Sequence, residues 1–245
     1  MKDNFSIQSD QYAKYRPKYP NDFFDYLGTI IKNKHVAWDC GTGNGQVAIE
    51  LAKRFTMVYA TDISLAQLAQ AQQLPNVIYS VQAAEKTNFP NDFFDLITVA
   101  QAIHWFDFEK FYGEIKRTAK PNATLVVMGY GKIEVSPEID SIISDFYKNT
   151  IGNYWDKERK YIDELYKTIP FPFEEIETPS FSISYNWSLD HFMGYLGTWS
   201  AVKHYINDTM QNPLDVIENQ LEDLWERDVV KKIKFPLLLR IGILK

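Results

Sequence analysis

The stretch that most constrains the fold of this chain is VAWDCGTGNGQVAIELAKRF, in which Gly41, Gly43 and Gly45 stand between an apolar run and a helical pattern. Glycine has no Cβ and tolerates positive φ angles, so a loop of this composition turns sharply and lets a ligand lie against its backbone. The apolar residues that follow recur at the spacing of a helix. The stretch therefore predicts a strand, a ligand-binding turn and a helix; the alternative is a tight turn whose glycines are incidental.

Four more apolar runs in the first half of the chain predict strands: MVYATD, NVIYSVQ, FFDLITVAQ and ATLVVMGY. A helix is expected in SLAQLAQAQQL, with Ser64 as its N-cap, and another in FEKFYGEIKRTAK, ended by Pro121. Strands joined by helices of this length form parallel βαβ units with right-handed crossovers. The expected fold class is therefore α/β, a doubly wound, mostly parallel sheet.

The pattern changes after Tyr130. Helices are expected in SPEIDSIISDFYKN, WDKERKYIDELYKTI, SLDHFMGYLGTWSAVKHYI and PLDVIENQLEDLWERDVV, and two last strands in FSISYNW and KIKFPLLLRIGIL. With these two strands the sheet has seven. We expect the extra helices to cover the carboxyl edge of the sheet, where open α/β sheets bind ligands. Because no low-complexity linker separates the halves, residues 1–245 are expected to form a single domain.

The glycine loop differs from two common phosphate-binding loops. A P-loop ends in Gly-Lys-Ser/Thr, which is absent here, and the dinucleotide fingerprint GxGxxG would need its third glycine where Gln46 stands. A second anchor is Asp62, at the end of VYATD. A carboxylate at the tip of the second strand is placed to accept both hydroxyls of an adenine-linked ribose. The alternative is that Asp62 only caps the helix that starts near Ser64.

Composition argues against several other classes. A net charge of −6 without a large basic cluster argues against a nucleic-acid partner. The single cysteine, Cys40, excludes an internal disulfide framework and a CxxC zinc site, and the four histidines lack the spacing of metal ligands, so no metal is expected. No apolar run approaches the roughly 20 residues of a membrane helix, and the first residues lack the apolar core of a signal peptide. No membrane association and a cytoplasmic location are expected.

The motif Asp39-x-Gly41-x-Gly43-x-Gly45, the acid Asp62 and the stretch FFDLITVAQAIHWFD together resemble class I S-adenosylmethionine-dependent methyltransferases of the small-molecule group called type 11. Three further stretches, YAKYRPKYP, AIHWFD and GYLGTWSAVKHY, are similar to the branch that includes trans-aconitate methyltransferases. The resemblance covers nearly the whole chain and implies a Rossmann-like methyltransferase fold.

The resemblance implies S-adenosyl-L-methionine as cofactor and S-adenosyl-L-homocysteine as product. The glycine loop would pass under the methionine part, Asp62 would take the ribose hydroxyls, and Ala84 and Glu85 would flank the adenine. Asp39 would help to hold the amino group, directly or through water. The implied cofactor-binding residues are Asp39, Gly41, Thr42, Gly43, Gly45, Asp62, Ile63, Ala84, Glu85 and Ala100. The chain departs from the family at Ala83, where many members carry an Asp that accepts from the adenine amino group.

The acceptor site follows from the same resemblance. The segment with Pro17 and Pro20 cannot be a regular helix; it resembles the family's N-terminal flap, in which Arg16 would pair with a carboxylate, and the alternative is a solvated linker. His104 is a candidate general base, or else a polar wall of the pocket. Trp199 is expected on an amphipathic helix, where packing is the alternative to a pocket role. The candidate substrate-binding residues are Tyr15, Arg16, Tyr19, His104, Trp105 and Trp199, with Tyr12 in the same flap.

The resemblance divides the chain into residues 1–20 as flap, 21–131 as the cofactor-binding half, and 132–245 as helical lid elements with the last two strands. The expected reaction is methyl transfer to a small-molecule acceptor, first of all O-methylation of a carboxylic acid. The alternatives are transfer to nitrogen or carbon of a small metabolite, a non-catalytic S-adenosylmethionine-binding protein, and an NAD-linked oxidoreductase. The oligomeric state is not indicated.

Overall fold

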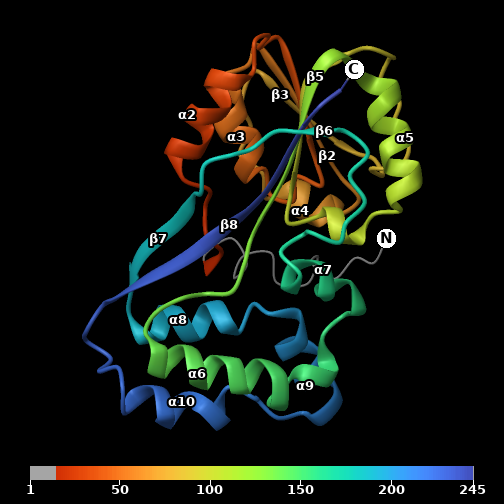
Figure 1. Cartoon of the computed structure of the whole chain (residues 1–245). Coiled ribbons are helices and arrows are strands. Elements are labelled where there is room, and N and C mark those ends of the chain that lie inside the picture. The colour runs from red at the N-terminus through yellow and green to blue at the C-terminus, as the bar shows by residue number, and fades with distance from the viewer. Residues whose placement is uncertain (1–14, 245) are drawn as a thin grey trace.

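The computed structural model describes residues 15–244 (Figure 1). Tyr12 and most of the expected flap, residues 1–14, lie outside the described residues. Element labels follow Figure 1 and begin at α2 (Asn21–Ile30).

A central sheet confirms the expected α/β fold. Its parallel strands stand in the order β3-β2-β1-β4-β5, and β8 (Lys231–Ile243) pairs antiparallel with β5. The parallel strands are β1 (Val36–Cys40), β2 (Met57–Asp62), β3 (Val77–Val81), β4 (Phe94–Ala100) and β5 (Ala119–Tyr130). Each begins within a residue or two of its predicted run, except β5, which starts four residues before Ala123.

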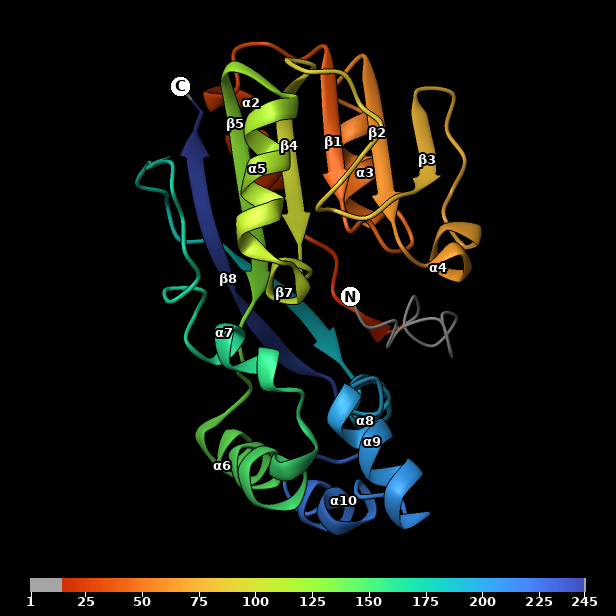
Figure 2. The same cartoon turned by 90° about the vertical axis from the view of Figure 1, so that its right-hand side faces the viewer.

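The far edge of the sheet is split into two strands. β6 (Glu174–Glu175) pairs with the last residues of β8, and β7 (Ser182–Trp187) pairs with its first half. Because both strands lie along β8, they share one position at the edge, and the eight strands fill seven positions. Figure 2 shows β7 and the start of β8 continuing beyond the ends of the parallel strands.

Helices cover both faces of the sheet. In Figure 1, α2 and α3 (Gln46–Ala52) lie on one side and α5 (Phe108–Thr118) on the other. Alternate residues of β5 serve the two layers: Val126 and Met128 pack in the α2–α3 core, whereas Leu125 and Val127 pack in the α5 core. This burial on both faces explains why the strand sequences are continuous apolar runs.

The remaining helices form a cap beyond the carboxyl ends of the parallel strands (Figures 1 and 2). We define the cap as α6 (Pro137–Asp145), the π-helical turn η2 (Phe146–Thr150), the 3₁₀ turn η3 (Gly152–Tyr154), α8 (Leu189–Leu196), α9 (Ser200–Thr209) and α10 (Asp215–Glu222). Its buried apolar residues form one cluster with Trp187 of β7 and Phe235 of β8. The extended β7–β8 ribbon therefore ties the cap to the sheet, over the edge where the sequence predicted a lid.

Helix ends follow local sequence where a cap residue is present. Ser64 is the predicted N-cap of α4 (Leu65–Ala69), and its hydroxyl accepts a hydrogen bond from the backbone N–H of Gln67. The prediction that Pro121 ends the preceding helix was wrong, because α5 ends at Thr118. Pro121 instead lies in β5, where the pairing with β4 is irregular and one missing N–H is tolerated.

Two further helix predictions were wrong. The stretch 155–169 holds only the short turns η4 (Lys157–Arg159) and α7 (Lys160–Asp163). Leu165 and Tyr166 have φ angles of 56° and 61°, which end a right-handed helix, and the Tyr166 ring is fully buried. The stretch 188–206 is two helices, α8 and α9, and Trp199 lies at their junction as the N-cap of α9. In the described residues, no helix is both long and apolar enough to span a membrane.

Candidate active site

Three neighbouring cavities lie between the sheet edge and the cap. The first, which we call the glycine-loop cavity, has a volume of about 1020 Å³ including its open mouth. Its walls come from the glycine loop, the ends of β2 and β4 and the segment around Arg16. Pockets for small molecules commonly measure about 300–1,000 Å³.

The glycine loop has the backbone that only glycine adopts without strain. The φ angles are 69° at Gly41, 57° at Gly43 and 84° at Gly45. A Cβ on Gly41 would lie 2.7 Å from the Cβ of Ala102, and one on Gly45 would lie 2.5 Å from the Tyr79 hydroxyl. Gly43 has only a distant side-chain atom at 3.9 Å and lines the cavity. The loop is therefore tightly packed behind and open in front, as a ligand cradle requires.

Asp62 joins the loop to the next helix and also lines the cavity. Its Oδ2 accepts from the Gly43 N–H at 2.8 Å, and its Oδ1 accepts from the Ser64 N–H at 2.9 Å. Asp62 therefore holds the backbone of Ser64, and Ser64 itself is the N-cap of α4. The two hydrogen bonds do not use all of the acceptor capacity of the Asp62 carboxylate, since its two oxygens offer about four lone-pair positions.

Asp39 lies fully buried behind the loop and does not line the cavity. Its oxygens accept from the hydroxyls of Thr42 at 2.5 Å and Thr98 at 2.8 Å. Burial raises the pKa of this carboxyl to about 6, against the lowering effect of the two hydroxyls. Because Thr42 does line the cavity, Asp39 reaches a ligand through the loop that it positions.

The other predicted cofactor residues divide in the same way. Thr42, Ile63, Ala84 and Ala100 line the glycine-loop cavity together with Gly41, Gly43 and Asp62. Gly45 and Glu85 do not; Glu85 instead accepts from the backbone N–H of Asp107, beside α5. From the same segment, Gln82 lines the cavity together with Ala84, whereas Ala83 is exposed.

The second cavity, the arginine cavity, has a volume of about 500 Å³ and shares Arg16, Gln101 and Trp105 with the glycine-loop cavity. Arg16 donates to the Tyr130 hydroxyl at 3.0 Å and to the Thr198 carbonyl at 3.2 Å, so it links the start of the chain to β5 and the cap. The full lining of the arginine cavity is Arg16, Gln101, His104, Trp105, Trp155, Asp156, Arg159, Ile162, Trp199 and Ser200.

Arg159 provides a second guanidinium to the arginine cavity. It lies over the Trp155 ring at 4.6 Å and donates through Nε to the Tyr147 hydroxyl at 2.9 Å. Within residues 15–244, no carboxylate comes close enough to form an ion pair with it. Asp156 is the acidic residue of the lining, set against two guanidinium groups.

Two neighbouring groups have pKa values lowered first by burial and second by a guanidinium group. Burial and then Arg159 lower the pKa of His104 from 6.5 to about 3. Burial and then Arg16 lower the pKa of Lys203. Both guanidinium groups thus disfavour further positive charge nearby, and by the same field they favour an anion.

His104 lies on the 3₁₀ turn η1 (Ile103–Trp105) after β4 and is only 6% exposed. Its Nδ1 is 3.4 Å from the Tyr166 hydroxyl, and the side chain lines the arginine cavity. With a pKa of about 3 the imidazole is neutral at physiological pH and a weak base. A buried, weakly basic ring in the cavity lining is consistent with the wall interpretation of His104, and its role stays a prediction.

The structure brings most of the acceptor candidates together. Tyr19 lines the glycine-loop cavity, Trp105 lines both of the first two cavities, and Trp199 lines the arginine cavity. Tyr15 lines none of the three described cavities; its ring packs against His191 at 5.0 Å and over Gly194.

Among the wall residues that the sequence analysis did not name are Gln101, Tyr130, Trp155 and Arg159. Gln101 is the last residue of the predicted run FFDLITVAQ and follows the end of β4 at Ala100, and that position alone was a signal for it. Its φ of 54° is unusual for a residue with a Cβ, and its side-chain amide donates to the Tyr130 carbonyl at 3.3 Å. Trp155 and Arg159 carried no local signal, because the stretch that holds them resembled an ordinary amphipathic helix.

A glycine cradle, an acidic strand tip and a deep cavity at the carboxyl edge define the class: an α/β protein whose site fits a nucleoside-bearing cofactor. In the described residues, no group of three or more His, Cys, Asp or Glu side chains is placed to hold a metal ion.

Comparison with known proteins identifies the family. The family described as "Methyltransferase domain" matches residues 38–127. A protein from Dictyostelium discoideum named as a methyltransferase is 34% identical over 223 residues, covering 89% of this chain and 85% of that protein. The chain therefore belongs to the methyltransferase family, and it is an S-adenosylmethionine-dependent methyltransferase.

Solved structures agree with this assignment. A structure described as a type II methyltransferase from Anaeromyxobacter dehalogenans has a TM-score of 0.87 and 38% identity, covering 94% of this chain and 98% of that one. A Bacillus halodurans structure described as a methyltransferase has a TM-score of 0.53 and 17% identity, covering 91% of this chain and 99% of that one. The second likeness concerns the fold alone.

Proposed function

We propose that this methyltransferase transfers the methyl group of S-adenosylmethionine to a carboxylate oxygen of a small acid, as a member of the trans-aconitate methyltransferase-like branch. The observation that carries the proposal is the arginine cavity. It shares three wall residues with the glycine-loop cavity and presents two guanidinium groups with aromatic side chains around them. A guanidinium matches a carboxylate in charge and in planar geometry.

In this proposal the glycine-loop cavity holds the cofactor. The open face of Gly43 lies beneath the methionine part, and Asp62 accepts from the ribose hydroxyls with the lone pairs that the loop leaves. Ile63 and Ala84 pack against the adenine. Asp39 acts indirectly, by holding the Thr42 hydroxyl. The cavities lie between the sheet and the cap, so residues 1–245 work as one unit.

When bound, S-adenosylmethionine supplies a methyl group activated by the positive charge on its sulfur. The task of this chain is to hold the acceptor in line and to exclude water, and orientation of that kind contributes about 7–11 kcal/mol. A carboxylate is already ionised at neutral pH, so no general base is needed. The neutral His104 is consistent with this chemistry, because it completes the wall without having to take a proton.

The test combines a methylation assay with a binding assay. The enzyme is incubated with methyl-labelled S-adenosylmethionine and a panel of carboxylic acids, amines and phenols. Methyl esters are recognised because mild alkali releases their label as methanol. Thermal unfolding with S-adenosylhomocysteine reports cofactor binding separately, since a hundredfold excess over Kd stabilises by about 2.7 kcal/mol. We expect alkali-labile product from an acid, and a midpoint shift that Asp62→Asn reduces.

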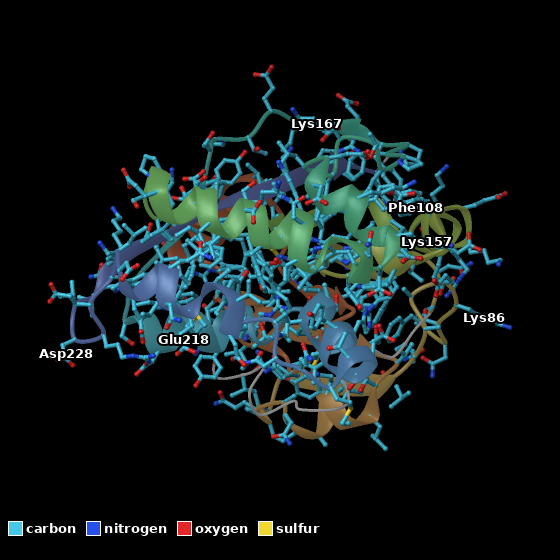
Figure 3. All side chains as sticks on the ribbon, turned by 90° about the horizontal axis from the view of Figure 1, so that it is seen from below. Lys86, Phe108, Lys157, Lys167, Glu218 and Asp228 are labelled. Carbon is cyan, nitrogen blue, oxygen red and sulfur yellow. The ribbon has the colours of Figure 1, made fainter. Side chains whose placement is uncertain are left out.

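Arg159→Gln is the matching acceptor variant, with Arg227→Gln as control. The control substitution also removes one positive charge, but Arg227 pairs with Glu218 and Glu222 on α10. In Figure 3, Glu218 lies at one end of the molecule and Lys157, of the same turn as Arg159, at the other. We expect Arg159→Gln to raise KM for the acid at least tenfold, and Arg227→Gln to leave it unchanged. Alkali-stable product formed only from amines or phenols would refute the carboxylate proposal.

A further inference from the structure

A third cavity, the cap cavity, adjoins the arginine cavity and is not needed to hold a carboxylate and a cofactor. Its volume is about 660 Å³, and it shares Arg159 and Trp199 with the arginine cavity. The lining comes from the end of β5, α6, η2, η4 and the junction of α8 and α9: Gly131, Lys132, Ile133, Asp140, Ile143, Ser144, Tyr147, Arg159, Tyr195 and Trp199.

The inner wall of the cap cavity is apolar. Ile133, Ile143, Tyr147, Tyr195 and Trp199 are each less than a tenth exposed. Buried apolar side chains that face an open hollow lack dispersion contacts on that side. The cap therefore gives up packing where a ligand would restore it.

The charged residues of the cap cavity already have partners. Lys132 is exposed, and its ammonium lies 5.2 Å from the Tyr147 ring centre. Asp140 accepts from the Val135 N–H at 2.8 Å and lies at the start of α6. Together with the shared Arg159, they give the lining of the cap cavity two cationic groups and one carboxylate. The arginine cavity has the same balance of two cationic groups and one acid, so the apolar wall, and not the charge, is what favours a tail in the cap cavity.

The arrangement of the cavities sets the direction of an acceptor. The methyl donor occupies the glycine-loop cavity, so the reacting carboxylate must face that cavity from the arginine cavity. The rest of the acceptor then points away from the cofactor, and the wall of Arg159 and Trp199 leads it into the cap cavity.

From these observations, and on the basis of the carboxylate methylation proposed above, we propose that the acceptor is a carboxylic acid with an apolar tail, aliphatic or aryl, which fills the cap cavity. The arginine cavity binds the head of this acid, and the cap cavity selects its length. Each methylene buried there lowers the free energy of the complex by the usual transfer value, which corresponds to a gain of about threefold to fourfold in affinity.

The experiment measures kcat/KM for straight-chain acids from acetate to dodecanoate, with succinate and glutarate as short polar acids. We expect kcat/KM to rise about threefold to fourfold per methylene over several carbons and then to level off when the cavity is full. Phenyl-terminated acids of matched length should follow the same trend.

Two tryptophan variants on one helix separate cavity filling from general disturbance. Ser144 of α6 lines the cap cavity, whereas Ser141 of the same helix is exposed and does not line it. We expect Ser144→Trp to lower kcat/KM for the long acids at least tenfold while that for acetate stays unchanged. Ser141→Trp should behave as the parent enzyme for every acid. An unchanged midpoint shift with S-adenosylhomocysteine shows that both variants are folded and bind the cofactor.

A flat dependence on chain length, a preference for the short polar acids, or the same effect from Ser144→Trp and Ser141→Trp would each overturn the tail proposal while leaving carboxylate methylation intact. Failure of the carboxylate proposal itself has a different signature: no acid of any length gives alkali-labile label, although S-adenosylhomocysteine still shifts the midpoint.

Discussion

His104 makes the stability of this enzyme depend on pH in a direction that can be calculated. The folded state holds the imidazole neutral, with its pKa lowered from 6.5 to about 3 by burial and by Arg159. In the unfolded chain His104 binds a proton near pH 6.5. Above pH 6.5 the ring is neutral in both states and does not change the free energy of unfolding. As the pH falls from 6.5 towards 3, the free energy of unfolding decreases, because only the unfolded state takes up the proton.

The magnitude follows from the linkage relation. Each pH unit within this window corresponds to about 1.36 kcal/mol, so between pH 6.5 and pH 5 the folded state loses about 2 kcal/mol through His104 alone. Asp39 acts in the opposite sense. Its pKa is raised from 3.8 to about 6, so its contribution to stability is greatest below pH 3.8 and is lost as the pH rises through 6.

Comparison with His104→Gln isolates the histidine, since Asp39 contributes equally to both proteins. Urea unfolding at pH 7.5 and pH 5.0 gives the free energy of unfolding of each protein at each pH. Between these two pH values we expect the parent enzyme to lose about 2 kcal/mol more stability than the variant. The same change between the two pH values in both proteins would refute the burial argument and would restore His104 as a candidate general base.

Three further predictions concern backbone strain and buried charge. Gly41→Ala places a Cβ 2.7 Å from another Cβ and should abolish the shift of the unfolding midpoint with S-adenosylhomocysteine. Its control is Gly113→Ala on α5, where a Cβ would have nothing within 4 Å; this variant should keep the shift and raise the free energy of unfolding by about 0.5–1 kcal/mol. Equal midpoint shifts in the two variants would contradict the role of the glycine loop as a ligand cradle. Gln101→Gly removes the strain of a left-handed backbone at a residue with a Cβ, which costs about 1 kcal/mol, so the midpoint of thermal unfolding should rise. At the same time kcat/KM should fall at least tenfold, because the side chain lines two cavities. Unchanged activity would argue against a role of Gln101 at the site. Asp95→Asn weakens a buried carboxylate that accepts two backbone N–H groups and pairs with Lys120 at 2.8 Å, so urea unfolding should show a loss of about 2–3 kcal/mol, with cofactor binding unaffected below the unfolding midpoint.

Local rules predicted the elements whose causes are local. The five parallel strands are apolar runs because both of their faces are covered, and Ser64 caps α4 as its side chain and position indicate. The same rules failed at residues 155–169. There the buried Tyr166 and two successive positive φ angles, imposed by packing against the sheet, override a helical pattern.

The cofactor side and the acceptor side of the site also differ in how far local sequence patterns reveal them. The glycine loop and Asp62 could be recognised from the chain alone, because a backbone at positive φ needs glycine at the position itself and because the end of a parallel strand is known from its pattern.

The acceptor side could not be recognised in this way. Arg16 and Trp199 were named only through the family resemblance, Gln101 and Arg159 were missed, and the four residues come from four distant segments. Only the tertiary structure decided that they share one cavity, because long-range packing of the cap on the β7–β8 ribbon brings them together. The sequence by itself thus determined the fold and the glycine cradle through local backbone chemistry, and it indicated the cofactor through the family resemblance. The shape and charge of the acceptor site arise from contacts between segments that no local pattern encodes.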